Sequence, residues 1–135
     1  WRIKAKTFKL KIITLDKIVV DKEIEKLFTK TAYGEIEFLP GYAESIISTV
    51  PCITKICDEN GSTEEVFTSK GIINIKNNEL TFLCDAAEYP EEIDFERAEK
   101  AKKRAENRLS EKEKYDIKRA EAALQRAIVR LSLKK

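Results

Sequence analysis

The residues with the clearest chemical potential in this 135-residue chain are arginines gathered near its end. Six of the seven arginines follow residue 96; Arg97 and Arg104 are seven positions apart and share one face of a helix. Arg126 and Arg130, four positions apart, share a face of a second helix. Guanidinium groups suit phosphate oxygens and carboxylates equally well. The spacing therefore predicts an anion-binding surface, and leaves open whether the anion is a phosphate or an acidic protein partner.

Interleaved acids offer a plainer interpretation of the same arginines. Each arginine could be neutralised by a neighbouring carboxylate on a solvated helix face, the more common outcome for charged helices. The candidate neutralising acids are Glu96, Glu99, Glu106 and Glu121.

No group of residues in the sequence predicts catalysis. The chain has no histidine, which excludes Ser-His, Cys-His and histidine-based metal chemistry. Cys52, Cys57 and Cys84 form no C-x-x-C pair and make a poor zinc site, so we expect reduced, small apolar residues. The four glycines, at 34, 41, 61 and 71, form no glycine-rich phosphate loop. We therefore expect a non-catalytic protein with no catalytic cofactor and no metal.

The first 90 residues have the composition of a β domain. They hold every glycine, proline and cysteine, and short runs such as "FKLKIIT" and "ELTFLC" alternate apolar and polar residues. Turn signals, among them "LPGY" at 39–42 and "KNNE" at 76–79, separate these runs. The pattern indicates an antiparallel β-sandwich or a flattened barrel over residues 1–90.

Residues 91–135 predict an antiparallel two-helix hairpin. Of these 45 residues 24 are charged, with a net charge of +4. Pro90 and the acids after it are typical of a helix start, and Ser110 with Glu113 fits a capping box for a second helix. Two apolar stripes at helical spacing face each other: Phe95, Ala98, Ala105 and Leu109, then Ile117, Ala120, Leu124, Ala127, Ile128 and Leu131. The fold class is therefore α+β, a sandwich followed by a hairpin.

Charge and hydropathy restrict the partners. The net charge of +2, with acids interleaved in the basic tail, argues against nucleic-acid binding. No apolar run approaches the roughly 18 residues of a membrane span, and nothing resembles a signal peptide. We expect a soluble protein without membrane insertion, for which peripheral attachment to a membrane complex stays open. We assign no function to residues 1–4.

Long segments of the chain resemble the epsilon subunit of bacterial F-type ATP synthases. The likeness covers residues 5–133, and runs through "KTFKLKIITLDK", "TAYGEIEFLPGYAE", "VFTSKGIINIKNNELTFLCDAAE" and "KRAEAALQRAIVRL". Its most specific part is the ID-x-x-RA motif within "EEIDFERAEKAKKRAENRL". Tyr42 and Glu44 depart from the family's usual histidine and proline, and "SKG" at 69–71 replaces "SGG".

The resemblance implies a rotor subunit of the central stalk. Its sandwich would contact the gamma subunit and the c-ring, and its hairpin would reach the alpha and beta catalytic subunits and inhibit ATP hydrolysis. Such a subunit couples ion translocation to ATP synthesis at the cytoplasmic side of the cell membrane, as a peripheral protein. The residues matching the c-ring-facing loop are Gly34, Glu35, Leu39, Pro40, Gly41 and Tyr42.

In several members of this family the folded hairpin binds ATP as a regulatory ligand. The residues matching that site are Glu88, Ile93, Asp94, Arg97, Ala98, Arg104, Arg126 and Arg130. A hypothesis of another class is a stand-alone nucleotide-sensing protein without a rotor partner. Association with alpha, beta and gamma subunits separates the two hypotheses.

Overall fold

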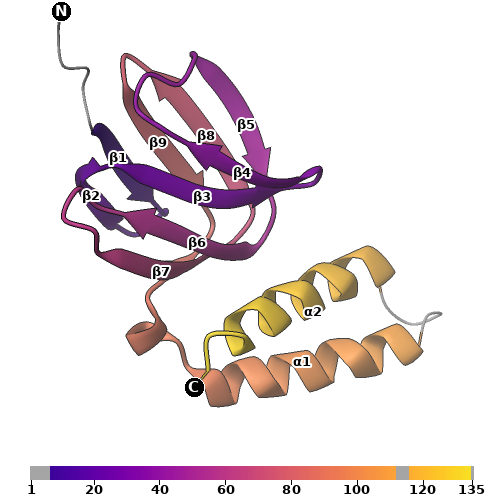
Figure 1. Ribbon diagram of the computed structural model, residues 1–135. Helices are drawn as coiled ribbons and strands as arrows, with labels where there is room; N and C mark the ends of the chain where they lie inside the picture. The colour runs from indigo at the N-terminus through magenta and orange to yellow at the C-terminus, as the bar shows by residue number, and fades with distance from the viewer. Residues whose placement is uncertain (1–6, 112–115, 135) are drawn as a thin grey trace, which may run out of the picture. The chain divides into compact units, whose positions relative to one another are not determined.

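The computed structural model in Figure 1 describes residues 7–111 and 116–134. The chain divides into two compact units, Trp1–Tyr89 and Pro90–Lys135. The first unit is a sandwich of two five-stranded sheets, and the second is a pair of helices. The predicted order of a β-sandwich followed by a helical hairpin is confirmed.

The first sheet has the strand order β2-β1-β9-β8-β5. Its strands are β1 (Phe8–Ile13), β2 (Ile18–Ile24), β5 (Ser45–Thr49), β8 (Gly71–Lys76) and β9 (Glu79–Cys84). Every pair in this sheet is antiparallel except β1 and β9, which run parallel. A parallel pair needs a long connection, and here most of the sandwich lies between the two strands.

The second sheet has the order β10-β7-β6-β3-β4, and all of its pairs are antiparallel. Its strands are β3 (Lys26–Thr31), β4 (Gly34–Phe38), β6 (Cys52–Cys57), β7 (Thr63–Thr68) and β10 (Ala87–Glu88).

The core lies between the sheets, because alternate residues of each strand point inward. Strand β1 shows the pattern: Phe8, Leu10 and Ile12 are buried, and the lysines between them are not. Cys52 and Cys84 are buried, Cys57 is half-buried, and all three are free thiols, as the sequence predicted. Burial raises the pKa of the Cys84 thiol to about 12, and the carboxylate of Asp85 adds to the shift.

Threonine hydroxyls form a hydrogen-bonded chain inside the second sheet. Thr54 Oγ1 lies 2.9 Å from Thr29 Oγ1 and 2.7 Å from Thr68 Oγ1, and all three residues are buried. Because each hydroxyl has a partner, the sandwich accommodates this polar layer without losing hydrogen bonds.

The second unit begins with the 3-10 turn η1 (Pro90–Glu92), followed by α1 (Phe95–Ser110) and α2 (Ile117–Leu131). The capping box predicted at Ser110 is wrong. Ser110 is the last residue of α1, where its hydroxyl donates to the carbonyl of Asn107, and Glu113 lies outside the described residues. Asp116 caps α2 instead. None of the described helices is long and apolar enough to cross a membrane.

Candidate anion-binding site

A side-chain cap fixes the beginning of α1. Asp94 is the N-cap, and its Oδ1 accepts a hydrogen bond from the backbone N–H of Arg97 at 3.0 Å. Asp116 does the same for the N–H of Arg119 at 3.2 Å at the start of α2. Asp94, predicted as part of an ATP site, therefore has a structural role, because it sets where Arg97 enters the helix.

Alanines form the seam between the helices. Ala98 and Ala105 are buried on α1, and Ala120 and Ala127 are buried on α2. Each pair is seven positions apart, so it lies on one face of its helix, and the two helices pack against each other. Ile128 is an exception to the predicted stripe, because it is 47% exposed. A seam of alanine permits close approach but buries little apolar surface.

Each buried alanine directly follows an arginine, and three of the four precede a glutamate. The triplet Arg-Ala-Glu occurs at 97–99, 104–106 and 119–121, and Arg-Ala-Ile occurs at 126–128. Successive helix residues are about 100° apart, so the residue before each alanine lies to one side of the seam and the residue after it to the other.

The antiparallel arrangement brings these arginines to the same side of the hairpin. The two helices face each other across the seam and run in opposite directions. Viewed from one end of the hairpin, the chain therefore turns clockwise in one helix and anticlockwise in the other, so the residues that directly precede the seam residues lie on the same side of both helices. Arg108 and Arg130, which precede the half-buried Leu109 and Leu131, follow the same rule. This arginine side comprises Arg97, Arg104, Arg108, Arg119, Arg126 and Arg130.

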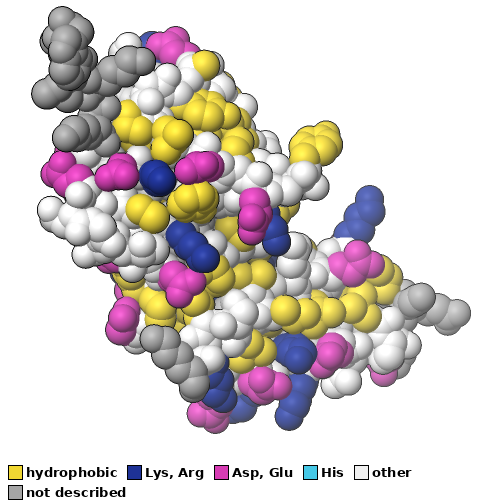
Figure 2. Space-filling view, in the orientation of Figure 1, with side chains coloured by type: hydrophobic (Ala, Val, Ile, Leu, Met, Phe, Trp, Pro, Cys, Tyr) yellow, Lys and Arg dark blue, Asp and Glu magenta, His cyan; other side chains and the backbone are white. Residues whose placement is uncertain are grey.

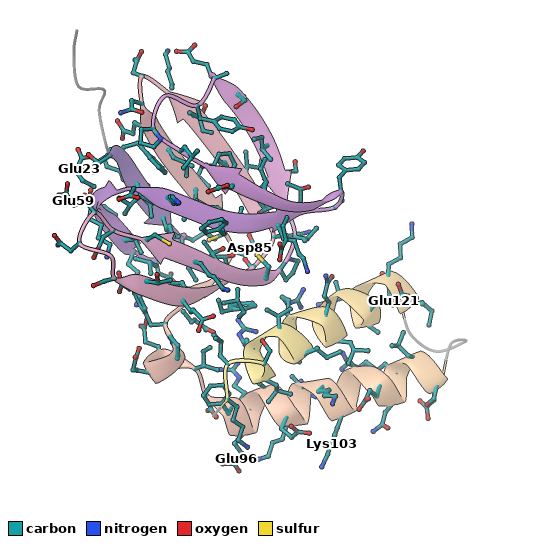
Figure 3. The ribbon with its side chains drawn as sticks, viewed as in Figure 1. Glu23, Glu59, Asp85, Glu96, Lys103 and Glu121 are labelled. Atoms are coloured by element: carbon teal, nitrogen blue, oxygen red, sulfur yellow. The ribbon has the colours of Figure 1, made fainter. Side chains whose placement is uncertain are left out.

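The opposite side, which we call the glutamate side, carries Glu99, Glu106 and Glu121. Glu96 pairs with Lys100 across 3.6 Å. Figure 3 shows Glu96 and Lys103 pointing away from α2, and positive and negative side chains alternate along this outer edge of α1 in Figure 2. Over residues 7–111 and 116–134, no ion pair involves the guanidinium groups of Arg97, Arg104 or Arg126. For these three arginines, the described residues therefore show no pairwise neutralisation by a neighbouring acid.

The structure groups most of the predicted ATP-site residues at one end of the hairpin. Arg97 lies in the first turn of α1 and Arg130 in the last turn of α2, with Arg126 one turn before it. Arg97 and Arg104 are exposed, and Arg126 and Arg130 are half-buried. Glu88 lies on β10 of the other unit, so its place in this site stays a prediction.

Sequence reasoning missed Arg119, which occupies the same triplet position as Arg97 and Arg104. The repeated Arg-Ala-Glu triplet could have indicated Arg119, once the alanines were known to form the seam. Such a side can bind and orient an anion, but guanidinium groups stay protonated and do not act as general bases. Within the described part of the chain, no three His, Cys, Asp or Glu side chains come close enough to hold a metal ion.

The residues predicted to face the c-ring lie at the two ends of β4. Gly34 and Glu35 begin the strand after the β3–β4 turn, and Leu39 to Tyr42 follow its end. At about 3.4 Å per residue, roughly 17 Å separates Gly34 from Leu39. A single flat partner would contact both groups only by lying along β4.

The turn at 39–42 is held firmly. The N–H of Gly41, whose φ is +80°, donates to Asn78 Oδ1 at 2.8 Å, and the amide of Asn78 donates to the carbonyl of Thr7 at 3.0 Å. The rings of Phe38 and Tyr42 lie 4.8 Å apart. Pro40 and Gly41 therefore form a rigid loop, whereas Tyr33, beside Gly34, is fully exposed.

Comparison with known proteins identifies both units. Residues 7–90 match the family model of the ATP synthase delta/epsilon chain beta-sandwich domain, and residues 91–135 match that of its long alpha-helix domain. The ATP synthase epsilon chain of Clostridium novyi is 50% identical over 109 residues, which are 81% of this chain and 83% of that one. The epsilon chain of Clostridium acetobutylicum is 43% identical over 105 residues, covering 78% of this chain and 79% of its own length.

Two solved structures share the fold. A chain in the cryo-EM structure of the Euglena gracilis mitochondrial ATP synthase, OSCP/F1/c-ring, matches with a TM-score of 0.70 at 20% identity. The match covers 94% of this chain and 76% of that chain. A chain in the Tetrahymena thermophila mitochondrial ATP synthase central stalk/c-ring matches with a TM-score of 0.55 at 16% identity, over 66% and 70% of the two chains.

Proposed function

Because this chain belongs to the ATP synthase epsilon chain family, we propose that it is a central-stalk subunit that couples rotation to ATP synthesis and restrains ATP hydrolysis. In this role the β-sandwich is the fixed part, which binds the gamma subunit and the c-ring. The helical hairpin is the mobile part, which inhibits hydrolysis when it reaches the alpha and beta subunits. The protein acts at the cytoplasmic face of the membrane as a peripheral, non-catalytic subunit.

The arginine side of the hairpin is the observation that carries the regulatory part of this proposal. Six guanidinium groups share one side of the helix pair. The buried residues of α1 and α2, which form the seam between them, are all alanines. A pair of helices with so little buried apolar surface is marginal alone. Its conformation is therefore easily biased by a ligand.

ATP is the ligand we propose for the folded hairpin. Arg97, Arg126 and Arg130 gather at one end of the hairpin and suit the phosphate oxygens, while Asp94 holds the first turn of α1 in place. A ligand at about 100 times its dissociation constant stabilises the state that it binds by about 2.7 kcal/mol. That free energy is enough to shift a marginal hairpin between two states.

The same arginines serve the extended hairpin in this proposal, where they pair with carboxylates of the catalytic subunits. Arginine forks recognise carboxylates and phosphates with the same geometry, so one surface suits both states. ATP then competes with the catalytic subunits for the arginine side. The nucleotide is not hydrolysed by this chain, because arginines supply no general base.

Association with purified alpha, beta and gamma subunits tests this function. We expect the full chain and residues 1–90 to co-purify equally well with the gamma-containing complex, because the sandwich makes the attachment. The isolated chain should turn over no ATP. Failure of the full chain to bind gamma would favour a free nucleotide-sensing protein instead.

A further inference from the structure

Two consecutive asparagines form the turn between β8 and β9. Asn77 and Asn78 have φ values of +53° and +60°, and Lys76 pairs with Glu79 on either side of them. A two-residue hairpin turn of this kind needs a positive φ at both central positions, which asparagine adopts more readily than most residues. The turn type explains an asparagine at both positions, so any further role of either side chain has to be found in its contacts.

The side chain of Asn78 joins two segments that are distant in the chain. Its Oδ1 accepts a hydrogen bond from the N–H of Gly41 at 2.8 Å, and its Nδ2 donates to the carbonyl of Thr7 at 3.0 Å. The backbone carbonyl of Asn78 also accepts from the N–H of Lys9 at 3.2 Å. The N–H of Gly41 can only donate and the carbonyl of Thr7 can only accept, so an amide, which has one group of each kind, matches both.

The group that Asn78 holds belongs to the central peptide of a β-turn. The N–H of Tyr42 donates to the carbonyl of Leu39 at 3.2 Å, which closes the turn. Pro40 stands at its second position and Gly41, with a φ of +80°, at its third, as in a type II turn. Types I and II differ mainly in the orientation of the central peptide, and glycine at the third position permits both. A fixed acceptor for the N–H of Gly41 therefore selects one of the two orientations.

The turn presents uncharged side chains to solvent. Leu39 is 45% exposed and Tyr42 is 37% exposed, and no residue from 39 to 43 is charged. The ring of Tyr42 lies 4.8 Å from the ring of Phe38, which belongs to the core. The turn is thus attached to the sandwich at two points, through this ring contact and through Asn78.

We propose that Asn78 positions this turn for the partner that the turn contacts, by holding the Pro40–Gly41 peptide in one orientation. A surface that is already ordered loses less conformational freedom when it binds, so a hydrogen bond behind that surface raises its affinity for the partner. The inference rests on the proposed function, under which the turn contacts the c-ring. Asn78 is not among the residues predicted to face the c-ring, and it acts through them.

Two measurements test the proposal: amide hydrogen exchange of Gly41 in the full chain, and the affinity of the complex with alpha, beta and gamma subunits for the purified c-ring in detergent. Asn78→Gly removes the side chain but keeps access to a positive φ. Without the hydrogen bond, exchange at Gly41 should become faster and the dissociation constant for the c-ring should rise, each by about 5- to 10-fold. Asn77→Gly is the matched control, because it makes the same replacement one position earlier in the same turn. It should change both quantities by less than about twofold.

Asn78→Asp separates the two hydrogen bonds of the side chain, because a carboxylate still accepts from Gly41 but cannot donate to Thr7. Its control is Asn77→Asp, which adds the same charge at the neighbouring position. We expect exchange at Gly41 and affinity for the c-ring to agree within about twofold between these two variants. A loss of affinity in Asn78→Asp as large as that in Asn78→Gly would assign the effect to the Thr7 contact and overturn the proposal.

Faster exchange at Gly41 in Asn78→Gly, without any change in affinity for the c-ring, would also overturn the proposal. In that case binding of the c-ring by the unaltered complex would still support the proposed function. If the complex with the unaltered chain binds no c-ring, the proposed function itself fails, and the role of Asn78 fails with it.

Discussion

Exchanging Arg104 and Glu106 should weaken ATP binding although it leaves composition and net charge unchanged. Both side chains are exposed, and both flank the buried Ala105, so the seam of the hairpin is untouched by Arg104→Glu/Glu106→Arg. The two positions are about 200° apart around the helix. The exchange therefore moves one positive charge from the arginine side to the glutamate side, and one negative charge the other way.

The size of the effect follows from this displacement. The diameter of a helix with its side chains is about 10 Å, which is also about the distance over which 0.1 M salt screens a charge. The electrostatic attraction between a guanidinium on the glutamate side and the bound phosphates is thus largely screened. Losing one charged hydrogen bond costs about 1.5–3 kcal/mol, and the exposure of Arg104 places it at the lower end of that range. We expect the dissociation constant to rise about 10- to 30-fold.

Calorimetric titration of ATP into the full chain measures this change, with far-UV circular dichroism to confirm that the helices are intact. The matched control is the exchange Glu96→Lys/Lys100→Glu, which reverses an ion pair on the outer edge of α1. It also conserves composition, and should change ATP affinity less than twofold because neither residue lies on the arginine side.

Equal ATP affinity of the Arg104/Glu106 exchange and the unaltered chain would refute the reasoning that one side of the hairpin binds the nucleotide. Equal losses in the exchange and in its control would show that ATP affinity does not depend on which side of the hairpin carries the exchanged charges. An unaltered chain that binds no ATP would leave the arginine side as a surface for an acidic protein partner alone.

Three further predictions concern the stability and reactivity of the two units. Gly71→Ala should lower the free energy of unfolding by about 3 kcal/mol in a urea titration, because a Cβ there would lie 2.2 Å from the carbonyl oxygen of Leu83; a loss under 1 kcal/mol would contradict the close approach. The Cys84 thiol, with a pKa of about 12, should resist iodoacetamide at pH 9 while Cys57 reacts. Equal labelling of the two thiols would contradict the raised pKa of Cys84. Because the thiol titrates near 9.0 in the unfolded chain, its ionisation should not affect the free energy of unfolding below pH 9 and should lower that free energy between pH 9 and 12. Asp116→Ala should destabilise α2 by about 1 kcal/mol in a thermal melt followed by circular dichroism, and Asp116→Asn should restore most of it; identical melts would argue against the cap.

The helical hairpin was readable from the sequence because its signals are local. Alanine spacing and acidic residues near helix starts mark the two helices, and the four arginines fell on the faces that their spacing indicated. The second helix start was misplaced because Ser110 and Asp116 are both acceptable caps, and only the end of α1 at Ser110 decides between them. The side of the hairpin that the glutamates occupy could be assigned only after the buried alanines had identified the seam.

The sandwich shows what local signals leave out. Alternation predicted strands, but the parallel pairing of β1 with β9 depends on contacts about 70 residues apart in the chain. That pairing places Ile13 beside Leu83, and no short window of sequence contains both residues. The two groups of residues predicted to face the c-ring are close in sequence, but strand β4 separates them.

ATP hydrolysis by a complex of alpha, beta and gamma subunits tests the central claim most directly. The complex would be assembled once with the full chain and once with residues 1–90, and assayed at low ATP, where the hairpin is least occupied by nucleotide. The account predicts faster hydrolysis with residues 1–90 at equal occupancy of the complex, because the inhibiting hairpin is missing. Equal rates with the two forms would contradict a regulatory hairpin and leave only the sandwich as the working part of the protein.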